Sequence, residues 1–317
     1  MCVRSLWRLR NKEESSPEHE RTRGNEYPLA PRERALRGPF SDYGGLRAMF
    51  RTPKHQLVRS LVNLLLLAIS LSALLATPAA YAQNMSVEQI ERRIVIGFQV
   101  NAEALQARLP SPWQLSAVAG GPLKGANCLI VLVDNLRTED PQGKATVSGT
   151  LRFAVFVAPA TNPQTGQTVS VVLGGFASNP AYVPGFYQVY NAATIRIQHA
   201  TQSVEGGADE QTDIWEVLGG TGKLELAFRL ISSPDPVTRS RTKSEINVIS
   251  AKDPALWRMY KYDAGTDIVK STAQGIDHIQ SLDLRIKAAE FADLFNGGEQ
   301  LVGINLVPWY IRQVYIR

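Results

Sequence analysis

Alternating apolar and polar positions run through most of residues 92–317 and predict a chain dominated by β-strands. In one segment Leu151, Phe153 and Val155 alternate with Arg152 and Ala154, which is the period-two pattern of a strand. The ranges expected to form strands are 92–100, 127–134, 146–159, 168–174, 192–204, 212–218, 223–230, 243–250, 279–286, 301–307 and 310–317. Segment 127–134 is almost wholly apolar, so we expect that strand to be buried on both faces.

Helical patterns are short and few. Residues 102–109 follow Asn101, a favourable N-cap residue, and stop at Pro110. We also expect short helices over 253–260, where a proline stands at the first helical position, and over 287–295, which a glycine pair ends. Turn residues at 162–167 and 219–222 predict two hairpins. The fold class is therefore α+β and mostly antiparallel β, a sheet or barrel with a few short helices at its edges.

The stretch 49–82 has the order of a secretory signal peptide. Its basic start contains Arg51, Lys54 and Arg59, an apolar run follows, and Ala80-Tyr81-Ala82 forms a small-residue cleavage site. The alternative is a membrane anchor, but the apolar run is shorter than the ~20 residues that a span needs. We therefore expect cleavage after Ala82, export to a bacterial periplasm or the medium, and no stable membrane anchor afterwards.

Residues 1–82 account for the positive net charge of the whole chain. Residues 1–48 lack apolar periodicity and are interpreted as an over-extended start, with Met49 the true first residue, or as a disordered extension. Residues 83–317 are expected to form a single domain. Residues 1–82, the leader, hold 13 basic and 7 acidic residues, a net charge of +6, so the formal charge of +5 for the whole chain leaves about −1 for residues 83–317. That balance argues against a nucleic-acid partner.

Cysteine and histidine are scarce after the leader. Cys128 is the one cysteine there, so no internal disulfide is possible, and its apolar neighbours predict a buried side chain. With His199 and His278 as the two histidines and no acidic cluster close by, we expect no metal site. No nucleotide-binding or serine-hydrolase motif is present, and we expect no cofactor.

Several short motifs resemble the acetoacetate decarboxylase family. They are the opening RRIVIGFQVNAEALQARLPSPWQL, Asn179-Pro180-Ala181 where the family has E-P-A, and Gly222-Lys223-Leu224-Glu225-Leu226-Ala227, which is similar to G-K-L-R-V-A. The resemblance implies a cone-like antiparallel β structure around an internal pocket, often in homo-oligomers. The family's mechanism needs a Schiff-base lysine. The matching segment here, 183–197, contains no lysine, so the resemblance implies the fold without that mechanism.

Candidate site residues follow from the patterns and the resemblance. His199 is the best candidate for proton transfer, although a histidine on a face with Ile195 and Ile197 is more often a core residue. Glu216 and Lys223 are further acid–base candidates, against an ordinary solvated hairpin. Aromatic residues that could hold a small organic ligand are Tyr182, Phe186, Tyr187 and Tyr190, which could equally form a loop packed over a sheet edge. Arg152 could pair with a ligand carboxylate or point outward.

Three hypotheses follow. The leading one is an exported domain that binds a small carboxylated or carbonyl-bearing molecule without Schiff-base chemistry. The second is a carbon–carbon or carbon–oxygen lyase or hydratase that acts on a keto acid by acid–base catalysis. The third is a structural or interaction domain with no ligand.

Overall fold

The computed structural model describes residues 84–316, apart from 148, 182–184, 204, 208, 220–223 and 234–238. The expected signal peptide, Tyr182 and Lys223 therefore lie outside the described residues. Within the described ranges no helix has the length and apolar character of a membrane span.

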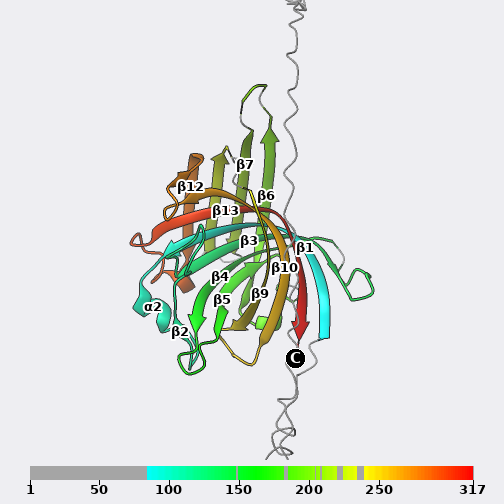
Figure 1. Cartoon of the computed structure of the whole chain (residues 1–317), viewed down its shortest axis with the longest axis vertical. Coiled ribbons are helices and arrows are strands. Elements are labelled where there is room, and N and C mark those ends of the chain that lie inside the picture. Colours follow the sequence, from blue (N-terminus) through cyan, green and yellow to red (C-terminus); the bar gives the residue numbers. More distant parts are fainter. Residues whose placement is uncertain are drawn as a thin grey trace, which may run out of the picture. The chain divides into compact units, whose positions relative to one another are not determined.

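Thirteen strands belong to one mixed sheet, in the order β12-β8-β7-β6-β5-β9-β10-β13-β1-β3-β4-β2, with β11 beside β10 (Figure 1). Their bounds are β1 Asn84–Gln99, β2 Gln114–Leu115, β3 Cys128–Glu139, β4 Leu151–Thr161, β5 Thr168–Ala177, β6 Tyr190–Gln202, β7 Glu210–Gly219, β8 Leu224–Ser232, β9 Ser240–Ser250, β10 Trp257–Ser271, β11 Ile276–Asp277, β12 Ile279–Ala288 and β13 Gln300–Ile316. The pairings are antiparallel except β5–β6 and β5–β9. Mostly antiparallel β structure is confirmed.

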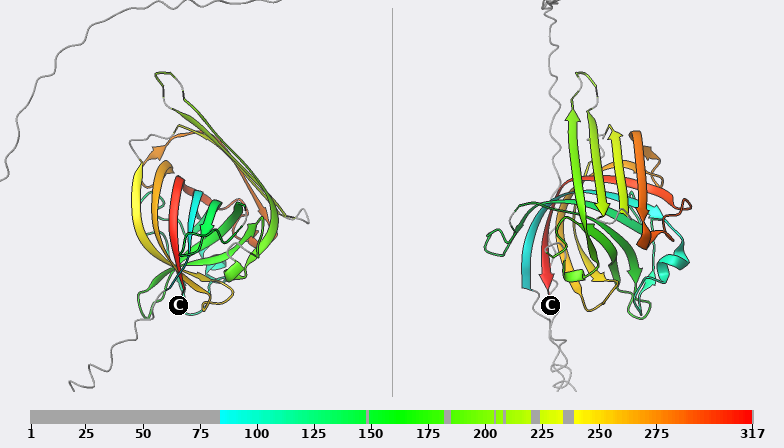
Figure 2. Two further views of the ribbon diagram at one scale, coloured as in Figure 1. Left: turned by 90° about the vertical axis from the view of Figure 1, so that its right-hand side faces the viewer. Right: turned by 180° about the vertical axis from the view of Figure 1, so that it is seen from behind.

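The pairing returns on itself, because β5 pairs with both β4 and β9. The strands β4, β5, β9, β10, β13, β1 and β3 therefore follow one another in a closed order. The four strands β6, β7, β8 and β12 form a second wall facing these curved strands (Figure 2). This arrangement creates two interior spaces, one among the seven strands and one between them and the second wall.

Each space has its own apolar core. The layer between the walls is filled by Ile96, Ile130, Phe156, Trp215 and Phe228 among others. The space among the seven strands is lined by a different set that includes Val133, Phe153 and Val172. Strand β4 serves both cores, since Phe153 and Phe156 face opposite sides. Cys128 is buried in the first core, as predicted, and burial raises the pKa of its thiol to about 12.

Three helical segments lie among the described residues: α2 Ala102–Gln106, η1 Gly185–Tyr187 and η3 Ala289–Phe291. The predicted N-cap is confirmed, because Asn101 Oδ1 accepts a hydrogen bond from the backbone N–H of Ala104 at 2.9 Å. The expected helix over 253–260 is wrong. Asp253 instead caps a tight turn, and β10 begins at Trp257.

The expected helix over 287–295 is also wrong, because β12 continues to Ala288 and only the short η3 follows. Its apolar residues are nevertheless buried: Phe291 stacks on Phe156 with ring centroids 4.1 Å apart. The two strands expected over 301–307 and 310–317 are one strand, β13. Pro308 lies at a register shift with both neighbouring strands, where its missing N–H costs no ladder bond.

Candidate functional site

A cavity of about 320 Å³ lies among the seven strands. That volume is at the lower end of the range for small-molecule sites. Most of its wall is aliphatic or aromatic and comes from β1, β3, β4, β5, β9, β10 and β13. The apolar residues are Val95, Leu123, Leu129, Val131, Val133, Phe153, Val155, Val157, Val172, Ile246, Val248, Ala264 and Val307. The polar side chains in this wall are those of Arg93, Arg312, Asn305, five tyrosines and the hydroxyl residues Ser170, Thr242 and Thr266.

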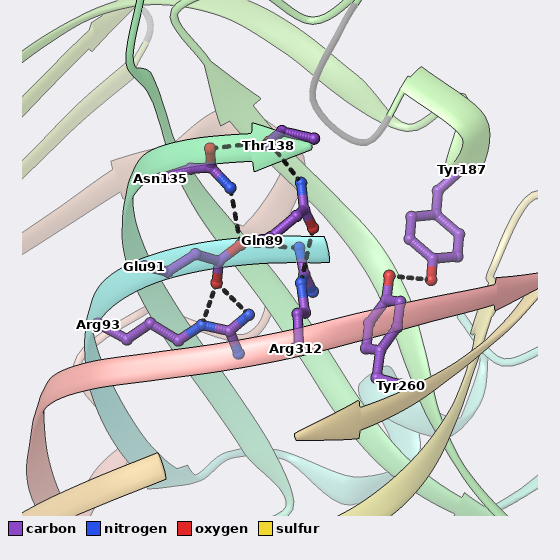
Figure 3. Close-up of polar contacts among 8 residues, drawn as sticks. All are labelled: Gln89, Glu91, Arg93, Asn135, Thr138, Tyr187, Tyr260 and Arg312. Carbon is purple, nitrogen blue, oxygen red and sulfur yellow. Dashed lines mark hydrogen bonds and ion pairs between the residues drawn. The ribbon is translucent and has the colours of Figure 1, made fainter. Parts of the chain in front are cut away.

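Glu91, Arg93 and Arg312 form a buried charge cluster beside the cavity (Figure 3). Arg312 Nη2 lies 2.9 Å from Glu91 Oε1, and Arg93 Nε donates to Glu91 Oε2 at 2.5 Å. Glu91 is fully buried and Arg312 is 6% exposed. The pairing of β1 with β13 brings these residues together from opposite ends of the described chain.

Neutral polar side chains hold this cluster in place (Figure 3). Asn135 Nδ2 donates to Glu91 Oε1 at 3.1 Å, and Thr138 Oγ1 donates to Asn135 Oδ1 at 3.0 Å. Gln89 closes the chain of bonds, because its amide donates to Thr138 Oγ1 and accepts from Arg312 Nε at 2.7 Å. A buried polar network with its members satisfied in this way is rigid.

The charges of the cluster are fixed. Burial alone would raise the pKa of Glu91, but the charges of Arg312 and Arg93 hold it below its usual range. Burial alone would lower the pKa of Arg312, and the nearby Glu91 carboxylate more than offsets this. One carboxylate thus faces two guanidinium groups. The excess positive charge lies at the cavity wall, where an anionic ligand group would be stabilised.

Five tyrosines also line the cavity: Tyr187, Tyr190, Tyr260, Tyr262 and Tyr310. The hydroxyls of Tyr187 and Tyr260 are 2.5 Å apart (Figure 3). Arg93 stacks over the Tyr310 ring at 3.5 Å, and Arg312 over the Tyr260 ring at 4.4 Å. The aromatic faces thereby hold the two guanidinium groups in position.

Burial keeps the phenols of Tyr187, Tyr190 and Tyr310 neutral. It raises the pKa of Tyr187 and Tyr190 well above the ordinary value, with Tyr260 adding to the effect, and raises that of Tyr310 to about 12. Asn305 adds a further polar group, since its buried Oδ1 has no hydrogen-bond partner among the described residues. The cavity therefore offers cationic donors, neutral hydroxyls and one free amide oxygen inside an apolar wall.

The structure brings two of the predicted ligand-binding residues, Tyr187 and Tyr190, into this cavity. Phe186 lies outside it, under Arg258 with 3.2 Å between the guanidinium carbon and the ring centroid. Arg152 does not line it either and pairs with Asp134 at 3.2 Å. Tyr182 lies outside the described residues.

The predicted acid–base residues are not brought together. His199 lines a different cleft and pairs with Asp213 at 2.8 Å. Glu216 lies on the opposite face of β7 from Asp213, where it is half-buried and makes a loose 3.5 Å contact with Arg196. Lys223 lies outside the described residues. Of the described residues that line the cavity among the seven strands, none is a lysine. The described residues hold no cluster of three or more His, Cys, Asp or Glu side chains suited to a metal.

Sequence reasoning missed Glu91, Arg93 and Arg312. A signal was present, since each stands within a strand pattern that is otherwise rich in apolar residues. The pattern did not show which of the charged side chains face the interior, because other polar residues lie next to them in the same strands.

Comparison with known proteins matches no family model and no curated protein. Solved structures do resemble the chain. The enduracididine biosynthesis enzyme MppR, complexed with pyruvate, is 10% identical over 75% of this chain and 90% of its own, with a TM-score of 0.46. An acetoacetate decarboxylase-like enzyme from Sphingomonas wittichii is 11% identical over 73% and 91%, with a TM-score of 0.41. Acetoacetate decarboxylase from Legionella pneumophila is 15% identical over 76% and 93%, with a TM-score of 0.37. The family named from the sequence is thus among the similar solved structures.

Proposed function

We propose that this chain is an exported protein whose cavity binds a small carboxylated or carbonyl-bearing molecule without forming a Schiff base. The observation that carries the proposal is the pair of guanidinium groups, Arg93 and Arg312, that face a single buried carboxylate at an apolar wall. A carboxylate ligand would supply the second negative charge, and its apolar body would fill the remaining space.

The closed strand order supports the finer expectation of a cone around an internal pocket. β5 joins β4 to β9, so hydrogen-bonded strands supply most of the cavity wall, with Leu123 and Tyr187 added from outside the strands. Side chains that project from strands are held more firmly than side chains on loops, and such a wall favours a ligand of defined shape.

The wall also supports non-covalent binding. A Schiff base needs a lysine amine within reach of the ligand carbonyl. The segment that matches the family's lysine-bearing stretch contributes Tyr187 and Tyr190 to the wall instead. These neutral hydroxyls can donate to a carboxylate or carbonyl oxygen, and the free Asn305 Oδ1 can accept from a ligand hydroxyl or amine.

Calorimetric titration of residues 83–317 with short aliphatic and branched carboxylic acids tests the proposal. Val155→Phe fills the cavity without touching the charge cluster, and it should abolish binding in a protein that still unfolds cooperatively. Arg312→Lys keeps the positive charge but loses the planar guanidinium that can donate two hydrogen bonds to a carboxylate, so the affinity for the ligand should fall about tenfold or more. Arg196→Gln, on an exposed face, is the matched control. Binding that survives Val155→Phe would place the ligand elsewhere.

A second candidate, a lyase or hydratase, is favoured by one observation: the ring of His199 is oriented by the buried carboxylate of Asp213. A histidine fixed in this way is suited to move a proton. Turnover of a keto acid that His199→Gln abolishes, and Glu216→Gln does not, would establish it. Neither His199 nor Glu216 lines the cavity among the seven strands, so these two substitutions test the lyase candidate independently of the binding proposal.

Export and assembly have direct tests. Cleavage after Ala82 predicts that protein recovered from the cell envelope begins at Gln83, which intact mass determines. The resemblance also implies a homo-oligomer, for which light scattering should give a multiple of the mass of residues 83–317.

A further inference from the structure

A second, larger space of about 740 Å³ opens where the two walls of strands separate. Its lining differs in character from the apolar cavity. β6 and β7 contribute His199, Gln211 and Asp213, and the opposite wall contributes Arg92, Arg93 and Asp267. We call this space the polar cleft; Asp209, Arg239 and His278 are its remaining charged or titratable residues.

The histidine of the polar cleft is held in one orientation. His199 and Asp213 are direct cross-strand partners in the pairing of β6 with β7. His199 Nδ1 lies 2.8 Å from Asp213 Oδ1, and Gln211 Nε2 donates to the other carboxylate oxygen at 2.7 Å. Asp213 is buried, with 3% of the residue exposed. Both of its oxygens are therefore engaged.

This arrangement assigns the tautomer of His199. An ionised carboxylate only accepts hydrogen bonds, so the ring nitrogen that faces Asp213 carries the hydrogen. In the neutral imidazole the other nitrogen, Nε2, is then an acceptor. Nε2 has no hydrogen-bond partner among the described residues, and the ring lines the polar cleft. The cleft therefore offers a fixed acceptor.

The cleft also offers one uncommitted cation. Arg93 is paired with Glu91, and Arg239 binds both oxygens of the buried Asp267 at 2.5 and 2.8 Å. Arg92 is half-buried and has no ion-pair partner among the described residues.

We propose that the polar cleft is a second ligand site, which takes a small hydroxy acid. Arg92 binds the carboxylate, and the ligand hydroxyl donates to Nε2 of His199. A free guanidinium and a free, oriented acceptor require a ligand that carries both an anion and a hydrogen-bond donor. The polar cleft and the apolar cavity should take different ligands, because the first offers polar partners and the second an apolar wall, although Arg93 lines both.

Malate and succinate test the proposal, because they differ by one hydroxyl group and their two carboxylates disfavour the apolar cavity. In calorimetric titration of residues 83–317, malate should bind about fivefold more tightly than succinate. Arg92→Gln should weaken both about tenfold or more. His199→Phe should remove the difference between the two. Arg196→Gln should change neither, and Val155→Phe should leave malate binding intact even where it abolishes binding in the apolar cavity.

Nuclear magnetic resonance of protein labelled with ¹⁵N in histidine keeps the test independent of how the variants fold. The His199 signal should report hydrogen on Nδ1, and malate, not succinate, should shift its Nε2 resonance. Equal affinity for malate and succinate in the unaltered protein, or undiminished binding by Arg92→Gln, would overturn the proposal. So would an Nε2 resonance that malate leaves unmoved.

Discussion

Arg312 of β13 and Glu91 of β1 form an ion pair in the interior, with 2.9 Å between Nη2 and Oε1. Both residues are buried, since Glu91 is 0% and Arg312 6% exposed. The pair is therefore unlike the exposed salt bridges elsewhere in the chain, and its loss has consequences for stability, pH response and ligand binding.

Glu91→Gln should destabilise the protein by about 3–5 kcal/mol, because it leaves Arg93 and Arg312 facing each other without a carboxylate. Urea unfolding monitored by circular dichroism measures this. Glu216→Gln, which removes an exposed pair with Arg196, is the control and should change stability by less than about 0.5 kcal/mol. Equal effects of the two substitutions would show that the buried cluster carries no special stability.

The same carboxylate predicts a response to acid. The pKa of Glu91 is lowered in the folded protein from its usual 4.5, so its contribution is complete above pH 4.5 and is lost as pH falls through the folded value. The difference in unfolding free energy between the unaltered protein and Glu91→Gln should therefore shrink below pH 4.5. Other acids, such as Asp263 with a pKa lowered to about 2 by Arg241, titrate in both proteins and cancel. A difference that does not vary with pH would contradict the assignment.

The Tyr187–Tyr260 hydrogen bond predicts non-additive substitutions. Either Tyr187→Phe or Tyr260→Phe leaves one buried hydroxyl without its partner and should cost about 1–3 kcal/mol. The double variant has no orphaned hydroxyl, so its loss should be smaller than the sum of the two single losses. A double-mutant cycle from chemical unfolding measures the coupling, and strict additivity would be the contrary result.

Gly175 predicts a steric limit beside the cavity. A Cβ atom there would lie 2.6 Å from the backbone oxygen of Ala154 and 2.6 Å from Cε1 of Tyr190. Gly175→Ala should therefore cost about 1–3 kcal/mol and displace the Tyr190 ring. Gly120→Ala, where no atom lies within 4 Å of the added Cβ, is the matched control and should be nearly neutral in thermal unfolding.

Local patterns predicted much of the fold. The N-cap at Asn101, the β4–β5 hairpin and the antiparallel pairing of β7 with β8 all follow from turn chemistry and alternation. β10 was missed because charged residues occupy buried positions in it: Asp267 is 2% exposed and is neutralised by Arg239. The proline at position 254 instead led to a predicted helix over 253–260, although Asp253 and Pro254 are equally suited to a tight turn.

The site was harder to predict than the strands. Arg312 and Gln89 are 223 positions apart and meet only because the last long strand pairs with the first. Long-range pairings of this kind leave no trace in local periodicity. The His199–Asp213 pair is different, since the two are only 14 positions apart across one hairpin. The predicted strands 192–204 and 212–218 indicate this hairpin but do not fix its register, and the observed pairing of Gln202 with Glu210 is what sets His199 opposite Asp213.

The central claim is that the cavity holds a carboxylate through arginines and not covalently through a lysine. Borohydride trapping of residues 83–317 with acetoacetate and related β-keto acids, analysed by intact mass, tests it most directly. We expect no adduct under conditions in which an acetoacetate decarboxylase control reacts. A stoichiometric adduct that maps to one lysine would contradict the claim and would establish Schiff-base chemistry at that position.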